Sequence, residues 1–163
     1  MKRASYLAQL RGFFKSHGKE NIVYFDESGF EKHSYRPHGW AVRGKKIYGN
    51  VSGNNRKDVN LIMAQRGKEW LAPVLFKGSC TAALVNTWLK DFLLKELDEP
   101  SVIVMDNARF HKKSEIRAIL KKAGHVLLPL PTYSPDFNPI EQSFAILKKR
   151  RQYSGKTIEA LLM

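Results

Sequence analysis

Cysteine is nearly absent from this sequence, which has a single one, Cys80, among 163 residues. One thiol cannot form a disulfide within the chain or build a thiolate zinc cluster, so we expect Cys80 to be a small buried apolar side chain. Long apolar runs are also missing, since none approaches the roughly 18–20 residues that a membrane-spanning helix needs. Residues 1–5 are charged but lack the apolar stretch of a signal peptide. The sequence therefore predicts a cytoplasmic protein with no membrane partner.

Acidic residues are scarce relative to basic ones. The chain has 15 Asp and Glu against 28 Lys and Arg, which gives a formal net charge of +13. Such an excess on a small chain favours a polyanionic partner, and nucleic acid is the commonest one. A generally basic surface without such a partner is the alternative that charge alone leaves open.

The chain does contain the material for one hydrophobic core. Hydrophobic residues make up 43% of the sequence and aromatic residues 11%. This composition excludes intrinsic disorder for most of the chain. A length of 163 residues fits one compact domain rather than a two-domain enzyme with its own cofactor fold.

Apolar patterning predicts an α/β fold. Apolar runs of strand length, bounded by turn residues, occur at 22–25, 59–64, 71–76, 101–105 and 125–128. Apolar residues recur at helical spacing in 1–18, 81–97, 113–123 and 138–151. The first three strands then form an antiparallel meander, and helical crossovers connect the later strands, so we expect a mixed sheet flanked by helices. Between residues 31 and 57 we expect a basic loop with a short strand at 40–42.

Three acids lie where such a fold places functional groups. Asp26 and Asp106 follow directly after apolar strands, and neighbouring strands would bring their side chains together at one edge of the sheet. Glu141 opens the last predicted helix at the rim of its apolar face. Carboxylates held close together repel one another unless a cation lies between them, and Mg²⁺ prefers such oxygen ligands. The acids therefore suggest metal-assisted phosphoryl chemistry.

Each of these residues also has a purely structural interpretation. Aspartate after a strand often forms an Asx-turn or a helix cap. Asn138, Pro139 and Glu141 fit a capping box in which Asn138 is the N-cap. His111 fits a proton shuttle, although a surface histidine near the start of a helix is the commoner case. Position alone leaves these alternatives open.

Three segments resemble the signature blocks of DDE transposases, in the mariner-like branch that includes many bacterial insertion sequences. They are residues 24–30 (YFDESGF), 104–111 (VMDNARFH) and 130–141 (LPTYSPDFNPIE). Between Asp106 and Glu141 lie 34 residues, the interval by which this branch is recognised. The likeness extends from about residue 4 to residue 151, and three blocks in order are far more specific than any single motif.

The resemblance implies an RNase H-like fold and a catalytic triad of Asp26, Asp106 and Glu141 that binds two Mg²⁺ or Mn²⁺ ions. It also implies that one site cleaves DNA at transposon ends and then transfers the 3′-hydroxyl into target DNA. Asn107 and His111 match the second block and are candidates for supporting the acids without binding metal. Transposon ends and target DNA are the implied partners, which associates the protein with the nucleoid.

Basic residues follow two of the three acids. DNA affinity comes largely from Lys and Arg at phosphates, so we expect phosphate contacts from both groups. One group is Lys112, Lys113, Arg117, Lys121 and Lys122, and the other is Lys148, Lys149, Arg150 and Arg151. A solvated helix face is the alternative for each group.

Transposases of this branch usually carry amino-terminal helix-turn-helix domains, and this chain begins just before the first block. We therefore expect a leader or linker helix at 1–18 and a catalytic domain at 19–163, with the DNA-binding half encoded separately or lost. A homodimer fits the need to hold two DNA ends together. Two alternatives stay open: a catalytically inactive DNA-binding remnant, and an RNase H-like nuclease that acts on RNA–DNA hybrids or branched DNA.

Overall fold

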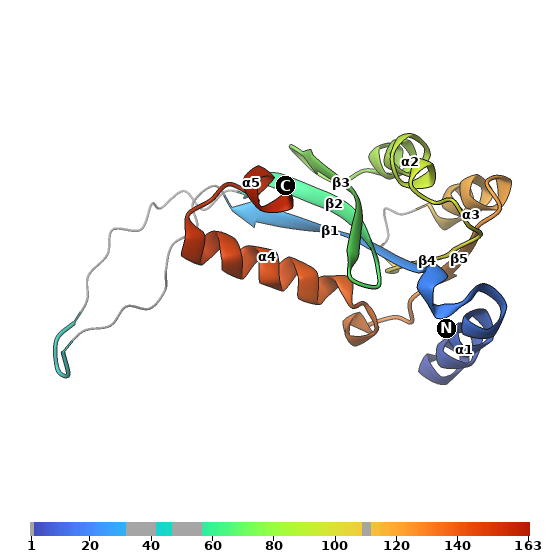
Figure 1. Ribbon diagram of the computed structural model, residues 1–163, viewed down its shortest axis with the longest axis horizontal. Helices are drawn as coiled ribbons and strands as arrows, with labels where there is room; N and C mark the ends of the chain where they lie inside the picture. Colours follow the sequence, from blue (N-terminus) through green and yellow to red (C-terminus); the bar gives the residue numbers. More distant parts are fainter. Residues whose placement is uncertain (1, 32–41, 47–56, 109–111) are drawn as a thin grey trace.

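The computed structural model describes residues 2–31, 42–46, 57–108 and 112–163. In these residues, helices cover both faces of one five-stranded sheet (Figure 1). The strands are β1 (Ile22–Glu31), β2 (Lys57–Arg66), β3 (Glu69–Phe76), β4 (Val102–Met105) and β5 (Val126–Pro129). The helices are α1 (Arg3–His17), α2 (Ala82–Asp91), α3 (Lys113–Lys122), α4 (Ile140–Ser154) and α5 (Glu159–Leu162).

The sheet is mixed, as the sequence predicted. Its strand order is β3-β2-β1-β4-β5, with β1, β2 and β3 antiparallel and with β4 and β5 parallel to β1. The turn between β2 and β3 contains Gly67, whose φ of +59° is a conformation that glycine adopts without strain. The short strand predicted at 40–42 lies largely outside the described residues, and Val42 itself is in a bend.

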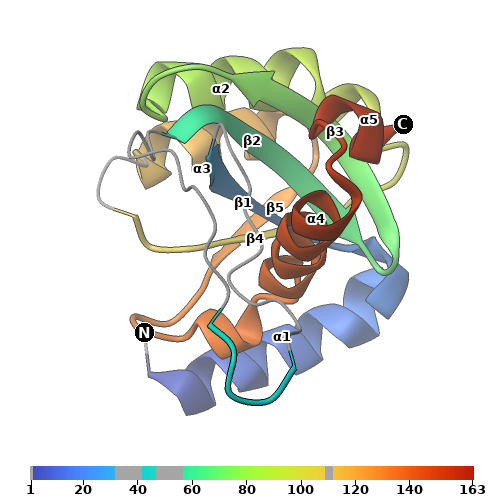
Figure 2. The ribbon, with the colours of Figure 1, turned by 90° about the vertical axis from the view of Figure 1, so that its left-hand side faces the viewer.

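Alternation along the strands divides the core between the two faces of the sheet (Figure 2). Val23 and Phe25 of β1 face α2 and α3, where the Phe25 ring lies 5.3 Å from the Trp88 ring. On the other face, Tyr6 of α1 packs with residues of β1, β4 and β5, and Phe144 of α4 packs with residues of β1 and β2. The even-numbered positions of β1 therefore face α1 and α4.

Helix α2 is shorter than the predicted helix at 81–97. Thr81 caps its start by accepting a hydrogen bond from the Leu84 amide, but the helix ends at Asp91. Phe92 has φ −123° and ψ −71°, and a 3₁₀ turn follows it. This change of direction leaves the Phe92 side chain exposed and buries Leu93 instead. The regular four-residue spacing of apolar residues did not reveal the break.

The sequence predictions for Cys80 and for membrane-spanning helices can be compared with the structure. Cys80 is half-buried and packs against the core on the α2 side, and burial raises the pKa of its thiol to about 12. None of the helices in the described part of the chain is long and apolar enough to cross a membrane.

Candidate active site

Asp26 lies in β1, and Asp106 directly follows β4, the parallel strand next to β1. The register of β1 and β4 sets Tyr24 opposite Val104, and its continuation sets Asp26 opposite Asp106. Both acids have the parity of Tyr24 and Val104, which pack on the α1 side of the sheet. Alternation therefore directs both carboxylates toward the face that α1 and α4 cover.

The prediction that Asp26 lies at the end of its strand is wrong. β1 continues to Glu31, because its second half pairs with β2 and the Phe30 side chain is buried in the core. This long antiparallel partner overrides the turn preference of residues 27–29. β4 pairs with β1 only as far as Tyr24, and Asp106 follows directly after β4 ends, so β1 extends past its parallel neighbour from about Asp26 onward. The local geometry is thus that of a strand end, although β1 itself does not end.

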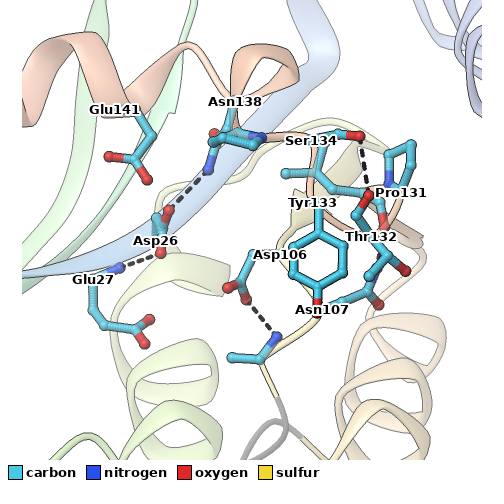
Figure 3. Close-up of a pocket in the computed structure, with 13 residues that line it drawn as sticks. Asp26, Glu27, Asp106, Asn107, Pro131, Thr132, Tyr133, Ser134, Asn138 and Glu141 are labelled. Carbon is cyan, nitrogen blue, oxygen red and sulfur yellow. Dashed lines mark hydrogen bonds between the residues drawn. The ribbon is translucent and has the colours of Figure 1, made fainter. Parts of the chain in front are cut away.

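A pocket of about 570 Å³ collects all three predicted acids. Glu141 reaches it from the first turn of α4, and its carboxylate lies on the same side as that of Asp26 (Figure 3). The pocket also contains a fourth carboxylate, Glu27, which the sequence interpretation missed even though it adjoins Asp26 in the first block. The lining residues are Asp26, Glu27, Asp106, Asn107, Ala108, Leu130, Pro131, Thr132, Tyr133, Ser134, Pro135, Asn138 and Glu141.

Asn138 joins the strand of the first acid to the helix that carries the third. Its Nδ2 donates a 2.9 Å hydrogen bond to Oδ2 of Asp26, which is 112 residues away in sequence. The Asn138 side chain is 3% exposed, and its Oδ1 is buried without a hydrogen-bond partner in the described structure. The predicted capping box is wrong, because α4 begins without a side-chain cap and the Asn138 amide is committed to Asp26 instead.

The surroundings of Asp26 disfavour the ionised form of its carboxyl group. Burial, followed by the charges of Glu27, Asp106 and Glu141, raises the pKa of Asp26 to about 8. The Glu27 amide, which donates a 2.8 Å hydrogen bond to Asp26 Oδ1, acts in the opposite direction. A metal cation in the pocket would favour the ionised form and offset the repulsion among the acids.

The donor set of the pocket fits hard divalent cations. Four carboxylates line it, and Mg²⁺ and Mn²⁺ prefer oxygen ligands. Among the described residues, no three His, Cys, Asp or Glu side chains are placed so that they could hold one ion together. Mg²⁺ commonly binds through only one or two carboxylates and takes its other oxygens from water or substrate phosphate. Two of the three acids Asp26, Asp106 and Glu141, which line the same pocket, would be enough for such a site.

We predict that Asn138→Leu weakens Mn²⁺ binding by about 10- to 100-fold, as is typical when a group that orients a ligand is lost. Leucine has nearly the same shape as asparagine but cannot hold the Asp26 carboxylate. Titration of Mn²⁺ by electron paramagnetic resonance measures the affinity directly. Ser143→Ala is the matched control, because Ser143 also links α4 to the sheet, through a 2.7 Å hydrogen bond to Gln65, without touching an acid. Equal affinities in the two variants would contradict the prediction.

The second block forms one wall of the pocket. Asp106 Oδ1 accepts a 3.0 Å hydrogen bond from the Ala108 amide, which is the Asx-turn that its position suggested. The Asn107 side chain donates to the Leu130 carbonyl and accepts from Lys113 Nζ. Asn107 therefore ties the segment after β4 to the segment after β5 and holds the Lys113 charge near the pocket. His111 lies outside the described residues.

The other predicted DNA contacts lie in or next to α3 and α4, outside the pocket lining. Lys112 is exposed and forms a 3.0 Å ion pair with Glu115, and Arg117, Lys121 and Lys122 lie on exposed positions of α3. On α4, Lys148 Nζ lies 5.7 Å from the Phe30 ring centroid, and the Arg151 guanidinium donates to the Glu31 carbonyl. Lys149 and Arg150 are exposed. At 3.3 Å per strand residue, Phe30 and Glu31 lie roughly 13–17 Å along β1 from Asp26.

The fold and the site together define a class of protein. The mixed sheet with helices on both faces is RNase H-like, and its pocket presents carboxylates suited to divalent cations. Residues 21–161 match the family model of the DDE superfamily endonucleases. The chain belongs to this family, because the match covers most of its residues.

Solved structures of one transposase share this fold. The Mos1 transposase paired-end complex with the left transposon end matches with a TM-score of 0.74 and 20% identity over 90% of this chain and 47% of that chain. The Mos1 strand transfer complex matches with a TM-score of 0.71 and 19% identity, covering 96% of this chain and 54% of that chain. The catalytic domain of Mos1 mariner transposase matches with a TM-score of 0.63 and 18% identity, covering 98% and 74%.

The chain spans about half the length of the first two Mos1 chains. At these identities the likeness concerns the fold. A search of curated protein sequences found no match.

Proposed function

We propose that this chain is the catalytic domain of a DDE transposase of the mariner-like superfamily, from the branch of bacterial insertion sequences. It cleaves a DNA strand and transfers the resulting 3′-hydroxyl into target DNA. The observation that carries the proposal is the pocket that Asp26, Asp106 and Glu141 share, although they come from three separate segments of the chain.

Asp26, Asp106 and Glu141 would hold two divalent cations, Mg²⁺ or Mn²⁺. Mos1 paired-end complexes have been solved with Mn and with Mg, which supports the same choice of cation here. Such ions, when bound, activate an attacking oxygen and stabilise the charge on a leaving oxygen. Two asparagines would position the acids. Asn138 orients the Asp26 carboxylate, and Asn107 fixes the segment that follows Asp106 by donating to the Leu130 carbonyl.

The two reactions have the same form. In cleavage, water attacks a phosphorus atom and the bond from phosphorus to the 3′-oxygen breaks, which leaves a 5′-phosphate and a 3′-hydroxyl. In strand transfer, that 3′-hydroxyl attacks a phosphate of the target strand, and the bond to the target's 3′-oxygen breaks in turn. In each step the attacking water or 3′-hydroxyl loses one proton, and the leaving 3′-oxygen gains one.

The basic residues fit DNA that extends beyond the pocket. The Lys148 and Arg151 contacts with β1 lie roughly 13–17 Å from Asp26, which corresponds to about four or five base pairs of axial rise. Lys113 lies at the pocket itself. We infer phosphate contacts at both places, from the Lys112 and Lys113 pair near the reacting strand and from Lys148, Lys149, Arg150 and Arg151 along the flanking duplex.

The wider arrangement is part of the same proposal. The Mos1 paired-end complex contains a transposon end, and its matching chain is about twice as long as this one. We infer that recognition of the ends comes from residues outside 19–163 and that two copies act together at two DNA ends. Action on DNA associates the protein with the nucleoid in the cytoplasm.

The test incubates the purified protein and Mn²⁺ with a plasmid and with an oligonucleotide that already carries a free 3′-hydroxyl. We expect metal-dependent nicks that leave 3′-hydroxyl ends, and joining of the oligonucleotide to the plasmid. Chelation by EDTA should stop both reactions. An RNA–DNA hybrid is included as a competing substrate.

Each alternative has its own result. Cleavage restricted to the RNA strand of the hybrid would replace the proposal with an RNase H-like nuclease. Salt-sensitive DNA binding without Mn²⁺ binding would indicate a DNA-binding remnant. Nicking without joining would leave an endonuclease and remove strand transfer from the proposal.

A further inference from the structure

We propose that the ring of Tyr133 is a stacking platform for a nucleobase next to the reacting phosphate. This inference rests on the proposed function, since it names a feature of the DNA in the same pocket. Tyr133 lines the pocket with the acids, and its side chain is 96% exposed (Figure 3). Asp106 and Asn107 belong to the lining of the same pocket.

The backbone of Tyr133 is held in an unfavourable conformation. Its φ of +54° lies in the left-handed region, which a bulky side chain rarely adopts. Folding gains no core contact from this placement, because the ring points into solvent. Strain that brings no packing is characteristic of functional positions.

Hydrogen bonds and an ion pair fix the segment that contains Tyr133. Ser134 is 4% exposed, and its hydroxyl donates to the Thr132 carbonyl at 3.3 Å. Arg3 of α1 donates to the Ser134 hydroxyl at 3.4 Å, forms an ion pair with Asp136, and lies 4.3 Å from the Phe137 ring centroid. The neighbours of Tyr133 are therefore fixed on both sides while its ring is displayed, so little ordering is needed on binding.

An exposed ring at this place suits a base that has left the helical stack. A metal site that reaches a backbone phosphate brings the adjoining nucleotide within range of the pocket wall. Aromatic side chains bind unstacked bases through their faces, whatever the base, because every base has a π-face. Stacking on the ring does not need the Tyr133 hydroxyl, so Tyr133→Phe should keep the interaction and Tyr133→Leu should lose it.

The test uses duplexes with a nick and one 2-aminopurine at successive positions around it, in buffer with Ca²⁺. Quenching of 2-aminopurine fluorescence reports stacking, and anisotropy of a distant dye reports binding. We expect quenching at one position by the parent and by Tyr133→Phe, and no quenching by Tyr133→Leu at saturating protein. Tyr133→Leu should also bind the DNA roughly tenfold more weakly. Tyr153→Leu, at a half-exposed tyrosine of α4 outside the pocket lining, is the matched control and should behave like the parent.

Quenching by Tyr133→Leu equal to that of the parent would overturn the proposal. Equal losses in Tyr133→Phe and Tyr133→Leu would also overturn it, because they would assign the effect to the hydroxyl. A parent that nicks DNA but quenches no position refutes stacking alone. A parent that neither nicks nor binds DNA refutes the proposed function as well, and the anisotropy signal separates these two results.

Discussion

Asp106→Asn should reduce metal-dependent DNA cleavage by on the order of 10³-fold or more. Asparagine keeps the size of the side chain and can still accept the 3.0 Å hydrogen bond from the Ala108 amide, so the turn after β4 is preserved. It removes one negative charge from the carboxylates of the pocket, where Asp106 directly follows β4 and Asp26 lies in the neighbouring strand β1. The loss should therefore affect metal binding and chemistry rather than folding, and gel assays of plasmid nicking with Mn²⁺ measure it.

The matched control for this variant is Asp91→Asn. It makes the same chemical change at an exposed carboxylate at the end of α2, outside the pocket. Asp91→Asn should cleave like the parent, and both variants should unfold at nearly the temperature of the parent. Cleavage by Asp106→Asn at the parental rate would remove Asp106 from the active site and, with it, the proposed assignment of the acids.

The mixed sheet was predictable because apolar runs and turn residues agree with each other along most of the chain. The run at 101–105 is buried on both faces as β4, and Gly124 follows α3 with a φ of +83° at the predicted stop. The predictions failed where a distant partner decides the outcome. β1 passes through a turn-like sequence because β2 pairs with it, and only that pairing shows that Asp26 is in mid-strand.

The meeting of the three acids in one pocket was also predictable, since each lies in a distinctive block. The groups around them were not. Asn138 has a satisfactory local explanation as an N-cap, and only the fold reveals that its amide reaches Asp26, 112 residues away. Tyr133 lies within the third block, but its exposure and its left-handed backbone depend on how Ser134 and Arg3 hold the segment. Local sequence cannot encode contacts that α1 and β1 supply.

Asp26→Asn should stabilise the metal-free protein, and the gain should grow as the pH rises from about 4 to about 8. Burial and neighbouring carboxylates raise the pKa of Asp26 to about 8 in the folded protein, against an ordinary value of 3.8 in the unfolded chain. Between these values the unfolded chain has released this proton while the folded protein still binds it. Stability therefore falls with rising pH across this window, and above it the cost is constant.

The size of the gain follows from the same linkage. Each pKa unit corresponds to about 1.4 kcal/mol, and because the carboxylates of the pocket titrate together we expect on the order of 3 kcal/mol near pH 8. For a chain of this size that corresponds to roughly 6–12 °C in Tm. The replacement is well tolerated locally, since Oδ1 can still accept from the Glu27 amide and the Asn138 amide can turn over to present its unpartnered Oδ1.

Thermal unfolding of the parent and of Asp26→Asn, in EDTA at several pH values from 4 to 9, measures this difference directly. Asp91→Asn, measured under the same conditions, controls for the general loss of one negative charge from a chain of net charge +13. Mn²⁺ should raise the Tm of the parent at pH 8 and change that of Asp26→Asn much less, because a ligand stabilises only the folded state that binds it.

A difference in Tm between the parent and Asp26→Asn that stays constant from pH 4 to pH 8 would contradict the raised pKa of Asp26. A parent that is stabilised no more than the variant by Mn²⁺ would contradict Asp26 as a ligand. The pH series and the Mn²⁺ addition together show whether the Asp26 carboxylate lowers the stability of the metal-free protein and also binds metal.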